Sequence, residues 1–484
     1  MEQNTKGVDT LLGNPRKAIL AMSIPLIIAL IAQSANNLID AVWVAGLGSE
    51  ALAAVGFIFP LFFILIGFGN GIGIGASSAI ARHIGRGDKE SVDSTATQAI
   101  VLIVIIAVVM TAFMLIFQRP LLEMMGAQDS LQFCVDYGTP IFAATIIFFF
   151  NGLLSNLLRS EGAAKRAMTT QILAAVINII LDPFFIYDTL VLGPFDVHVN
   201  GLVLGPFTLH GFGLGMTGAA LATTIAVSVS LAVILFWFFI QRDTYIKIKA
   251  KHIRLERNTV YDILRVGIPA SLEMIVMSLF SIVINMIIVK ADWGEDGLAI
   301  FSSTWRIVQM LMIPNMAIGG AVVPVFAAAY GARRFDKIKE AYFYALKVCT
   351  IIMVVIVAIT LLSADGMVMI FTYDENVAYL KDDMASCLRI LSLFLPFMSW
   401  GFVGAGLFQS MGLGFYSFVC TVVRNGLQIP ASWILLVTVG TTVSITWGVS
   451  SMEILGSLLG GLWSFMLLRA LIKRSSVPVP ETEE

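Results

Sequence analysis

Long apolar runs separated by short polar stretches dominate the pattern of this chain. Twelve of these runs approach or exceed the roughly 20 residues that a membrane-spanning helix needs. Their approximate bounds are 18–45, 52–80, 95–117, 136–158, 168–187, 214–240, 262–289, 297–326, 340–363, 384–410, 413–439 and 443–470. The polar stretch up to Lys17 predicts that the first run stays in the protein rather than leaving as a signal peptide. We therefore predict an all-α integral membrane protein with twelve transmembrane helices.

Composition supports this class. Of the 484 residues, 58% are hydrophobic and 13% are charged, whereas soluble domains have about 45–50% and about 25%. The 30 Lys and Arg balance 32 Asp and Glu, which excludes a nucleic-acid binder. The four cysteines stand apart from one another and from His clusters, so neither a disulfide framework nor a zinc site is expected.

Basic residues indicate the orientation, because cytoplasmic loops of membrane proteins are enriched in Lys and Arg. With the N-terminus inside, the outward loops hold only Arg119, Lys290 and Lys381. The inward segments hold Lys6, Arg16, Lys17, Arg82, Arg86, Lys89, Lys165, Arg166, Arg242, Lys247, Lys249, Lys251, Arg254, Arg257, Arg333, Arg334, Lys337, Lys339, Lys473 and Arg474. We predict a multi-pass protein of the cell membrane with both termini in the cytoplasm.

The two halves of the chain are related by an internal repeat. The segment ILAMSIP, which ends at Pro25, aligns with ILRVGIP, which ends at Pro269. The segment IGRGDK at 84–89 aligns with YGARRFDK at 330–337. Six spans in each half give both halves the same orientation, so the repeat is parallel. We predict a cytoplasmic segment 1–17, an N-lobe 18–241, a cytoplasmic linker 242–261, a C-lobe 262–472 and a disordered cytoplasmic tail 473–484. Duplicated halves around a central cleft are typical of alternating-access transporters.

Several motifs carry a family resemblance. They are Asn37-x-x-Asp40, LRSEG at 158–162, INIILDP at 177–183, GAALAT at 218–223, GIPASLE at 267–273 and FTYDENV at 371–377. Together they resemble the multidrug and toxic compound extrusion (MATE) family, in its prokaryotic NorM/DinF-like branches, over nearly the whole chain. The resemblance implies two six-helix lobes, a V-shaped central cavity and export of organic cations in exchange for Na+ or H+.

Polar residues inside the spans are candidates for function, because burying them in a bilayer is costly. Asp40 on the first span and Asn178 and Asp182 on the fifth lie on helix faces that cannot face lipid. Two carboxylates with amide and hydroxyl oxygens suit a hard cation or a shared proton. The resemblance assigns Asp40, Asn178, Asp182 and Thr223 to an N-lobe cation site. The alternative is that the two Asp only cap or hydrogen-bond within their helices.

Further polar residues are expected to line a substrate cavity: Gln33, Asn36, Asn37, Asn156 and Glu273. In the second repeat, Gln428 and Ser432 stand opposite Asn178 and Asp182, and Glu273 is the one clear intramembrane acid. The resemblance places an acid at Glu273 near the cavity, where it holds a cationic substrate or moves protons. The alternative is a structural pair with a neighbour such as Arg306.

A glycine run at Gly67–Gly75 reads G-x-x-x-G-x-x-x-G. Part of it mimics a dinucleotide-binding fingerprint, but no strand precedes it and no acidic residue follows at the required distance. Close helix packing is the better explanation. No Walker A motif occurs in the sequence, so direct coupling to ATP is not expected.

The segment 187–213 contains LVLGPF twice, at 190–195 and 202–207, with Asn200-Gly201 between them. Asn-Gly flanked by alternating apolar residues is a strong hairpin signal. We predict an extracellular β-hairpin loop there.

An ion-coupled exporter of amphipathic cations is the favoured function. It needs no cofactor beyond the coupling ion, Na+ or H+, and its partners are small organic cations and the lipid bilayer; we expect a monomer. A flippase or exporter of lipid-linked or other small molecules remains the alternative within transport. An integral-membrane enzyme is less favoured, because His83, His198, His210 and His252 all lie in predicted loops.

Overall fold

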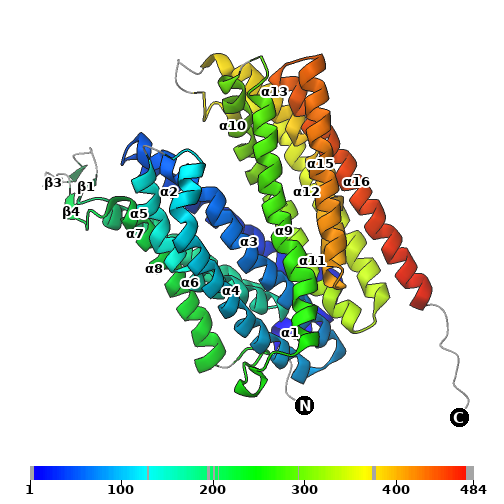
Figure 1. Ribbon diagram of the computed structural model, residues 1–484. Helices are drawn as coiled ribbons and strands as arrows, with labels where there is room; N and C mark the ends of the chain where they lie inside the picture. Colours follow the sequence, from blue (N-terminus) through cyan, green and yellow to red (C-terminus); the bar gives the residue numbers. More distant parts are fainter. Residues whose placement is uncertain are drawn as a thin grey trace, which may run out of the picture.

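The structure is a computed structural model that describes residues 5–127, 130–192, 197–199, 202–204, 207–241, 243–292, 294–372 and 378–475. It consists almost wholly of long helices in two lobes (Figure 1). The lobes lie side by side near the short helix α1 (Lys6–Leu12) and splay apart toward the opposite end. This is the arrangement expected for the predicted lobes.

The N-lobe contains α2 (Pro15–Ala45), α3 (Ser49–Arg86), α4 (Lys89–Met124), α5 (Leu131–Ala143), α6 (Thr145–Ser160), α7 (Ala164–Ile186) and α8 (Gly215–Leu235), which continues into the π-helix η1 (Phe236–Gln241). The C-lobe contains α9 (Arg257–Ile288), α10 (Glu295–Leu311), α11 (Ile313–Gly331), α12 (Phe335–Val368), η3 (Ala378–Leu380), α13 (Lys381–Ser392), α14 (Leu395–Ser410), α15 (Gly414–Thr438) and α16 (Thr442–Ser475). A 3-10 turn, η2 (Ala250–His252), lies in the linker.

Eleven of the twelve predicted spans correspond to single helices or bent pairs, while the predicted span 297–326 covers most of two separate helices, α10 and α11. Among the described residues, nine helices are long and apolar enough to cross a membrane, or eleven when each of two bent pairs counts as one span. These pairs are α5 with α6, bent by 52°, and α13 with α14, bent by 42°. The predicted span 413–439 is α15, which misses the hydropathy criterion because Arg424, Asn425 and Gln428 lie within it. All twelve predicted spans thus have a helical counterpart.

Local signals explain the helix ends. Asn14 caps α2 by accepting a hydrogen bond from the backbone N–H of Arg16 at 2.9 Å, and Pro15 occupies the first helical position. Gly87 takes the left-handed conformation (φ 73°) that ends α3, and Asp88 then caps α4 through the backbone N–H of Ser91 at 3.0 Å. Helices α3 and α4 therefore meet in a tight turn.

The segment 187–213 forms two antiparallel strand pairs, β1 (Thr189–Leu192) with β4 (Phe207–His210), and β2 (Val197–Val199) with β3 (Leu202–Leu204). Val199 pairs with Leu202, and the predicted turn residues Asn200 and Gly201 lie outside the described residues. A hairpin is therefore present where the sequence predicted one, and an outer strand pair extends it. The tail beyond Ser475 also lies outside the described residues.

Glycines bring α3 of the N-lobe against α9 of the C-lobe. A Cβ atom at Gly71 would lie 2.6 Å from the carbonyl oxygen of Gly267, and one at Gly75 would lie 2.8 Å from the backbone nitrogen of Gly267. Both distances are too short for a real side chain, so only glycine allows this approach. The explanation of the glycine run as helix packing is confirmed.

The contact between α3 and α11 is reciprocal. A Cβ at Gly85 would lie 2.8 Å from the carbonyl carbon of Ala328, and a Cβ at Gly331 would lie 2.8 Å from the carbonyl carbon of Arg82. Gly85 and Gly331 are equivalent positions of the IGRGDK and YGARRFDK motifs. Such an exchange of partners is what a twofold relation between repeats produces.

Hydrogen bonds also join the two lobes at the end near α1. Arg82, only 1% exposed, donates to the Asp262 carboxylate at 2.9 Å and to the Ser410 carbonyl at 3.1 Å. Ser78 donates to the Gln409 carbonyl at 2.6 Å. Asp262 is also paired with Arg265. The lobes are thus held closed near α1 by buried hydrogen bonds as well as by close packing.

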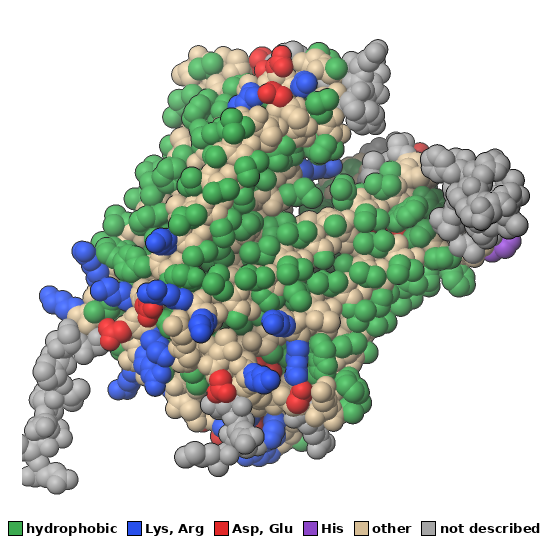
Figure 2. Space-filling model, turned by 180° about the vertical axis from the view of Figure 1, so that it is seen from behind, with side chains coloured by type: hydrophobic (Ala, Val, Ile, Leu, Met, Phe, Trp, Pro, Cys, Tyr) green, Lys and Arg blue, Asp and Glu red, His purple; other side chains and the backbone are tan. Residues whose placement is uncertain are grey.

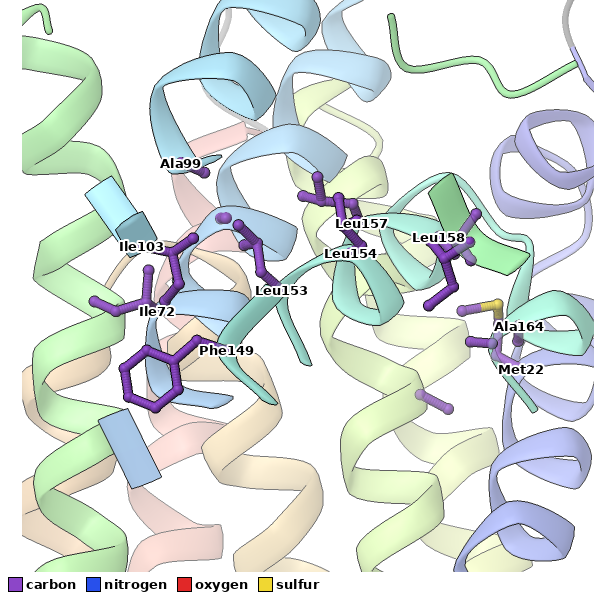
Figure 3. Close-up of a cluster of buried hydrophobic side chains, with 14 of the residues drawn as sticks. Met22, Ile72, Ala99, Ile103, Phe149, Leu153, Leu154, Leu157, Leu158 and Ala164 are labelled. Atoms are coloured by element: carbon purple, nitrogen blue, oxygen red, sulfur yellow. The ribbon is translucent and has the colours of Figure 1, made fainter. Parts of the chain in front are cut away.

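The N-lobe core consists of aliphatic and aromatic side chains contributed by several helices. Figure 3 shows Ile72 of α3, Ile103 of α4 and Phe149 and Leu153 of α6 in one cluster, each at most 1% exposed. In a bilayer, such helix contacts gain mainly from van der Waals packing. The core therefore holds the helices that carry the polar residues in fixed positions.

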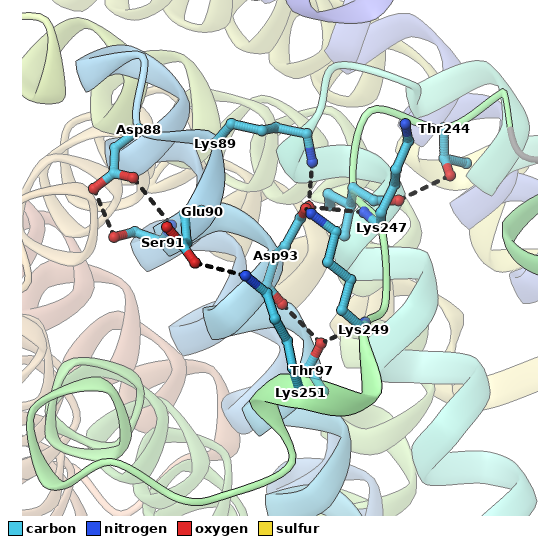
Figure 4. A network of polar contacts seen from close by, with 11 residues as sticks. Asp88, Lys89, Glu90, Ser91, Asp93, Thr97, Thr244, Lys247, Lys249 and Lys251 are labelled. Carbon is cyan, nitrogen blue, oxygen red and sulfur yellow. Dashed lines mark hydrogen bonds and ion pairs between the residues drawn. The ribbon is translucent and has the colours of Figure 1, made fainter. Parts of the chain in front are cut away.

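The linker is fastened to the N-lobe (Figure 4). The carboxylate of Asp93 pairs with Lys89 and Lys249 and accepts the backbone N–H of Lys247 at 2.9 Å. Glu161, 1% exposed, accepts the backbone N–H of Ile246 at 3.0 Å. Burial raises the pKa of the Glu161 carboxyl to about 7, although the hydrogen bond from the Ile246 backbone N–H lowers this pKa.

The surface is divided in the way that a bilayer requires. Figure 2 shows many hydrophobic side chains across the middle of one face and a concentration of Lys and Arg at the end near α1 and the linker. Exposed Ile, Leu, Val and Phe are numerous on α2, α4, α12 and α16. A water-facing surface this apolar would aggregate, whereas lipid accommodates it.

Candidate functional site

A chain of polar side chains connects α2, α7 and α8 in the N-lobe. The amide of Asn36 on α2 donates to Asn178 Oδ1 on α7 at 2.9 Å. The amide of Asn178 in turn donates to Asp182 Oδ1 at 2.6 Å and lies 3.3 Å from Thr223 Oγ1 on α8. Asn178 and Asp182 are one helical turn apart and are 3% and 0% exposed. The structure therefore brings Asn178, Asp182 and Thr223 together.

Asp40 joins this group from the next turn of α2. Its carboxyl lies within hydrogen-bond reach of the Asp182 carboxyl. Three buried oxygens of the group accept no hydrogen bond: Asn36 Oδ1, Asp40 Oδ1 and Asp182 Oδ2. Among the described residues, no Lys, Arg or His interacts electrostatically with either carboxyl.

This arrangement has a clear chemical consequence. Two carboxyl groups in contact cannot both be charged in a low-dielectric interior unless a cation lies between them or one of them is protonated. The unpartnered oxygens supply acceptors for either. The alternative of a helix-internal role accounts for only one oxygen of Asp182, which bonds to Asn178. One proton shared by the two carboxyls would account for the oxygens of Asp40 and Asp182, whereas a cation would also engage Asn36 Oδ1.

Tyr137 on α5 is a neighbour that the sequence reading missed. It is 9% exposed, and its phenol is close enough to feel the charge of both Asp40 and Asp182. Toward the hairpin end, the Tyr187 hydroxyl donates to the carbonyl of Trp43 at 2.5 Å, and the two rings meet edge to face. The polar group thus lies among aromatic side chains of α2, α5 and α7. An isolated Tyr in an apolar helix carries no sequence signal that separates this position from ordinary core.

The residues predicted for the substrate cavity are placed differently from one another. Gln33 and Asn37 are exposed on α2 and Asn36 is half-buried, bonded to Asn178. Asn156 is 5% exposed, and its amide bonds to the carbonyl of Gly152 and to Arg159. Its polar atoms are therefore engaged within α6.

Glu273 lies in a second polar group, inside the C-lobe. Its carboxyl contacts Ser417 of α15 and Gln409 of α14, and the nearest basic side chain is Arg424. The expected partner Arg306 is exposed on α10, so that pairing is wrong. Glu273 is also not the one intramembrane acid of the C-lobe, because Glu453 of α16 is 3% exposed and pairs with Arg424.

Comparison with known proteins confirms both the family and the repeat. The MatE family model matches twice, over residues 25–184 and 269–434. The two matches begin at Pro25 and Pro269, the residues at which the internal repeat was aligned. They include Asp40, Asp182 and Glu273.

Curated relatives extend over nearly the whole chain. The multidrug export protein MepA of Staphylococcus aureus (strain MSSA476) is 24% identical over 93% of this chain and 94% of its own length. The probable multidrug resistance protein YoeA of Bacillus subtilis (strain 168) is 26% identical over 74% of this chain and 73% of its own.

Solved structures share the fold. A crystal structure of MATE in complex with MaL6 has a TM-score of 0.90 and 36% identity, covering 97% of this chain and 100% of that one. A MOP superfamily transporter from Pyrococcus furiosus Vc1 (DSM3638) gives the same values; its description states that a reversed polarity of the binding pocket suggests a different function. An outward-facing MATE transporter has a TM-score of 0.87 and 34% identity over 97% of this chain and 100% of its own. With its duplicated lobes, its membrane helices and these matches, the chain belongs to the MatE family of multidrug efflux transporters.

Proposed function

We propose that this chain exports amphipathic organic cations from the cell in exchange for Na+ or H+ bound between Asp40 and Asp182. The observation that carries the proposal is the group of unpartnered buried oxygens at Asn36, Asp40 and Asp182. The names of MepA and YoeA, which describe multidrug export and resistance, support the choice of cargo. Cofactors other than the ion are not needed.

The site can couple ion and cargo through charge. An ion that loads the pair of carboxyls removes net negative charge from the N-lobe and changes how α2 packs against α7. A cationic cargo and the ion then disfavour each other's binding, and linkage makes this effect reciprocal. With Na+, the oxygens of Asn178 and Thr223 serve as ligands, whereas a proton does not require them.

The distribution of charge on the surface supports a proposed orientation. The end rich in Lys and Arg in Figure 2 contains α1, the linker and the closed contact between the lobes. We assign this end to the cytoplasm, which places both termini inside and the hairpin outside. With this orientation the lobes splay apart toward the outside, which supports an outward-facing state, and we propose that the carrier acts as a monomer.

Transport in everted membrane vesicles tests the proposal. Efflux of a fluorescent organic cation is measured under a Na+ gradient alone and under a pH gradient alone, in wild type and in Asp40→Asn. We expect one gradient to drive transport in wild type and neither to do so in the variant. Full gradient-driven transport by Asp40→Asn would overturn the assignment of the site. Transport of a lipid-linked substrate instead of the cation would favour the flippase.

A further inference from the structure

A groove opens on the C-lobe between α9 and α15, toward the end farthest from α1, where these two helices run side by side (Figure 1). Its volume is about 240 Å3. All but one of the residues that line it are apolar, and Lys290 is the exception. The lining consists of Val283, Met286, Ile287, Lys290, Ile429 and Trp433.

The face of α9 that carries the groove is directed away from the other lobe. Met286 and Ile268 are both exposed and lie five helical turns apart on the same face of α9. Ile268 follows Gly267, which packs against α3 where the two lobes are in contact. A side chain exposed at that end faces the surroundings of the protein rather than the space between the lobes. In a membrane, this face of α9 therefore contacts lipid.

Lys290 lies at the mouth of the groove, two residues beyond the end of α9. Its Nζ atom is 5.4 Å from the centre of the Trp433 ring, which is a cation–π contact. Among the described residues, no carboxylate forms an ion pair with Lys290. The carboxylate of Asp292, two residues further, accepts the backbone N–H of Thr442 at 3.1 Å. The ammonium group of Lys290 therefore has donors for an anion at the mouth.

The matching position in the N-lobe is closed. In the internal repeat, Lys290 corresponds to Gly46 of α2, and Val437 of α15 corresponds to Tyr187 at the end of α7. The Tyr187 hydroxyl donates to the carbonyl of Trp43 at 2.5 Å, and a Cβ atom at Gly46 would overlap this hydroxyl. Tyr187 thus covers the line of contact between α2 and α7. Val437 is 70% exposed and too short to do the same, so the groove is a particular feature of the C-lobe.

The shape and charge of the groove indicate the chemistry of its occupant. From Val283 to Lys290 the helix rises by about 10 Å, which is a large part of the roughly 15 Å of hydrocarbon in one leaflet. An acyl chain therefore fits along the apolar lining. A cationic cargo is disfavoured beside the ammonium group, whereas a phosphate group at the level of the lipid headgroups is attracted to it.

We propose that this groove is a lipid site selective for an anionic phospholipid, whose acyl chain lies between α9 and α15 and whose phosphate binds Lys290. Trp433 holds the lysine at the mouth through its ring and contacts the chain with its edge. The site is separate from the export of cations and does not depend on it.

Quenching of tryptophan fluorescence by brominated lipids tests the proposal, because Trp433 lines the groove. The protein is reconstituted into vesicles that contain increasing fractions of brominated phosphatidylglycerol, which is anionic, or of brominated phosphatidylcholine, which is zwitterionic. Each protein is compared with its own Trp433→Phe counterpart, so that the difference in emission reports on Trp433 alone. The test variant is Lys290→Gln. Its matched control is Lys381→Gln, which changes a basic residue at the start of α13 in the same lobe.

One lysine at the membrane surface gives about a fivefold preference for an anionic lipid. We therefore expect the wild type to bind phosphatidylglycerol about five times more strongly than phosphatidylcholine at Trp433. Lys290→Gln should reduce this ratio to about one, and Lys381→Gln should retain it. Val283→Phe, which fills the groove, should weaken the quenching of Trp433 by both lipids.

Equal quenching by the two lipids in the wild type would overturn the proposal, as would a preference that survives in Lys290→Gln. Unchanged quenching in Val283→Phe would place the acyl chain outside the groove and would also overturn it. Loss of the preference on addition of inorganic phosphate would show a site for a free anion instead of a lipid. Failure of cation efflux in vesicles would affect the proposed function and leave these results as they are.

Discussion

Replacing Gly75 by alanine tests whether the close contact between α3 and α9 holds the lobes together at the end near α1. The new Cβ would lie 2.8 Å from the backbone nitrogen of Gly267, whereas carbon needs about 3.5 Å from another heavy atom. The carbonyl oxygen of Ile263 would lie closer still to this Cβ, and no flexible side chain is available to yield, so the helices must separate by about 1 Å. Overpacking of this kind costs about 1–3 kcal/mol.

Gly56→Ala is the matched control, because it lies on the same helix and its Cβ would meet no atom within 4 Å. Both substitutions gain about 1 kcal/mol of helix propensity, so their difference isolates the contact. Thermal unfolding in detergent should show Gly75→Ala as the less stable of the two. Pulsed electron paramagnetic resonance between labels at Arg86 and Tyr261, both exposed, should show a longer distance between the two lobes at this end. Equal stability and equal label distances for both variants would refute the reasoning.

Three further expectations concern charge. The pKa of Glu161 is raised to about 7, above the ordinary value of 4.5, so folding is favoured while its carboxyl is protonated. The free energy of unfolding should therefore fall as pH rises from about 4.5 through 7. Thermal unfolding followed across this range should show a less steep fall in Glu161→Gln. Arg82→Gln should lower the free energy of unfolding by about 3 kcal/mol, which is the low end for a broken buried ion pair because Arg265 still neutralises Asp262. The exposed Arg86→Gln should lower it little in the same unfolding assay. A cysteine at Lys251 and a tag after Glu484 should both be reached only by cytoplasmic probes; labelling from outside would contradict the assigned orientation.

The helices and the repeat could be predicted from the sequence because both leave local signals. A run of apolar residues identifies a span whatever packs against it, and Pro25 and Pro269 begin the two matches to one family model. The glycines of α3 could also be interpreted, since a G-x-x-x-G run predicts close packing. It does not name the partner, and α9 lies in the other half of the chain.

Pairing in space was harder to predict. Arg306 was the basic residue on the next helix and was therefore the natural partner for Glu273, but α10 turns it outward and Arg424 of α15 is nearer. Glu453 was missed for a related reason. A single acid in a long apolar helix becomes informative only when the guanidinium that neutralises it is known.

The two lobes illustrate how one repeated fold carries two different polar groups. Thr223 follows Gly218 by five residues, and Glu453 follows Gly448 by five; each glycine packs against the preceding helix of its lobe. Among the described residues, no Lys, Arg or His acts on the two carboxyls of the N-lobe group, so a charge that neutralises them has to come from solution. In the C-lobe, Arg424 lies 3.2 Å from Glu453 and supplies a fixed positive charge to the polar residues there. The proposed exchange of a cation with solution is therefore assigned to the N-lobe, where binding of the ion and binding of a cationic cargo would be linked.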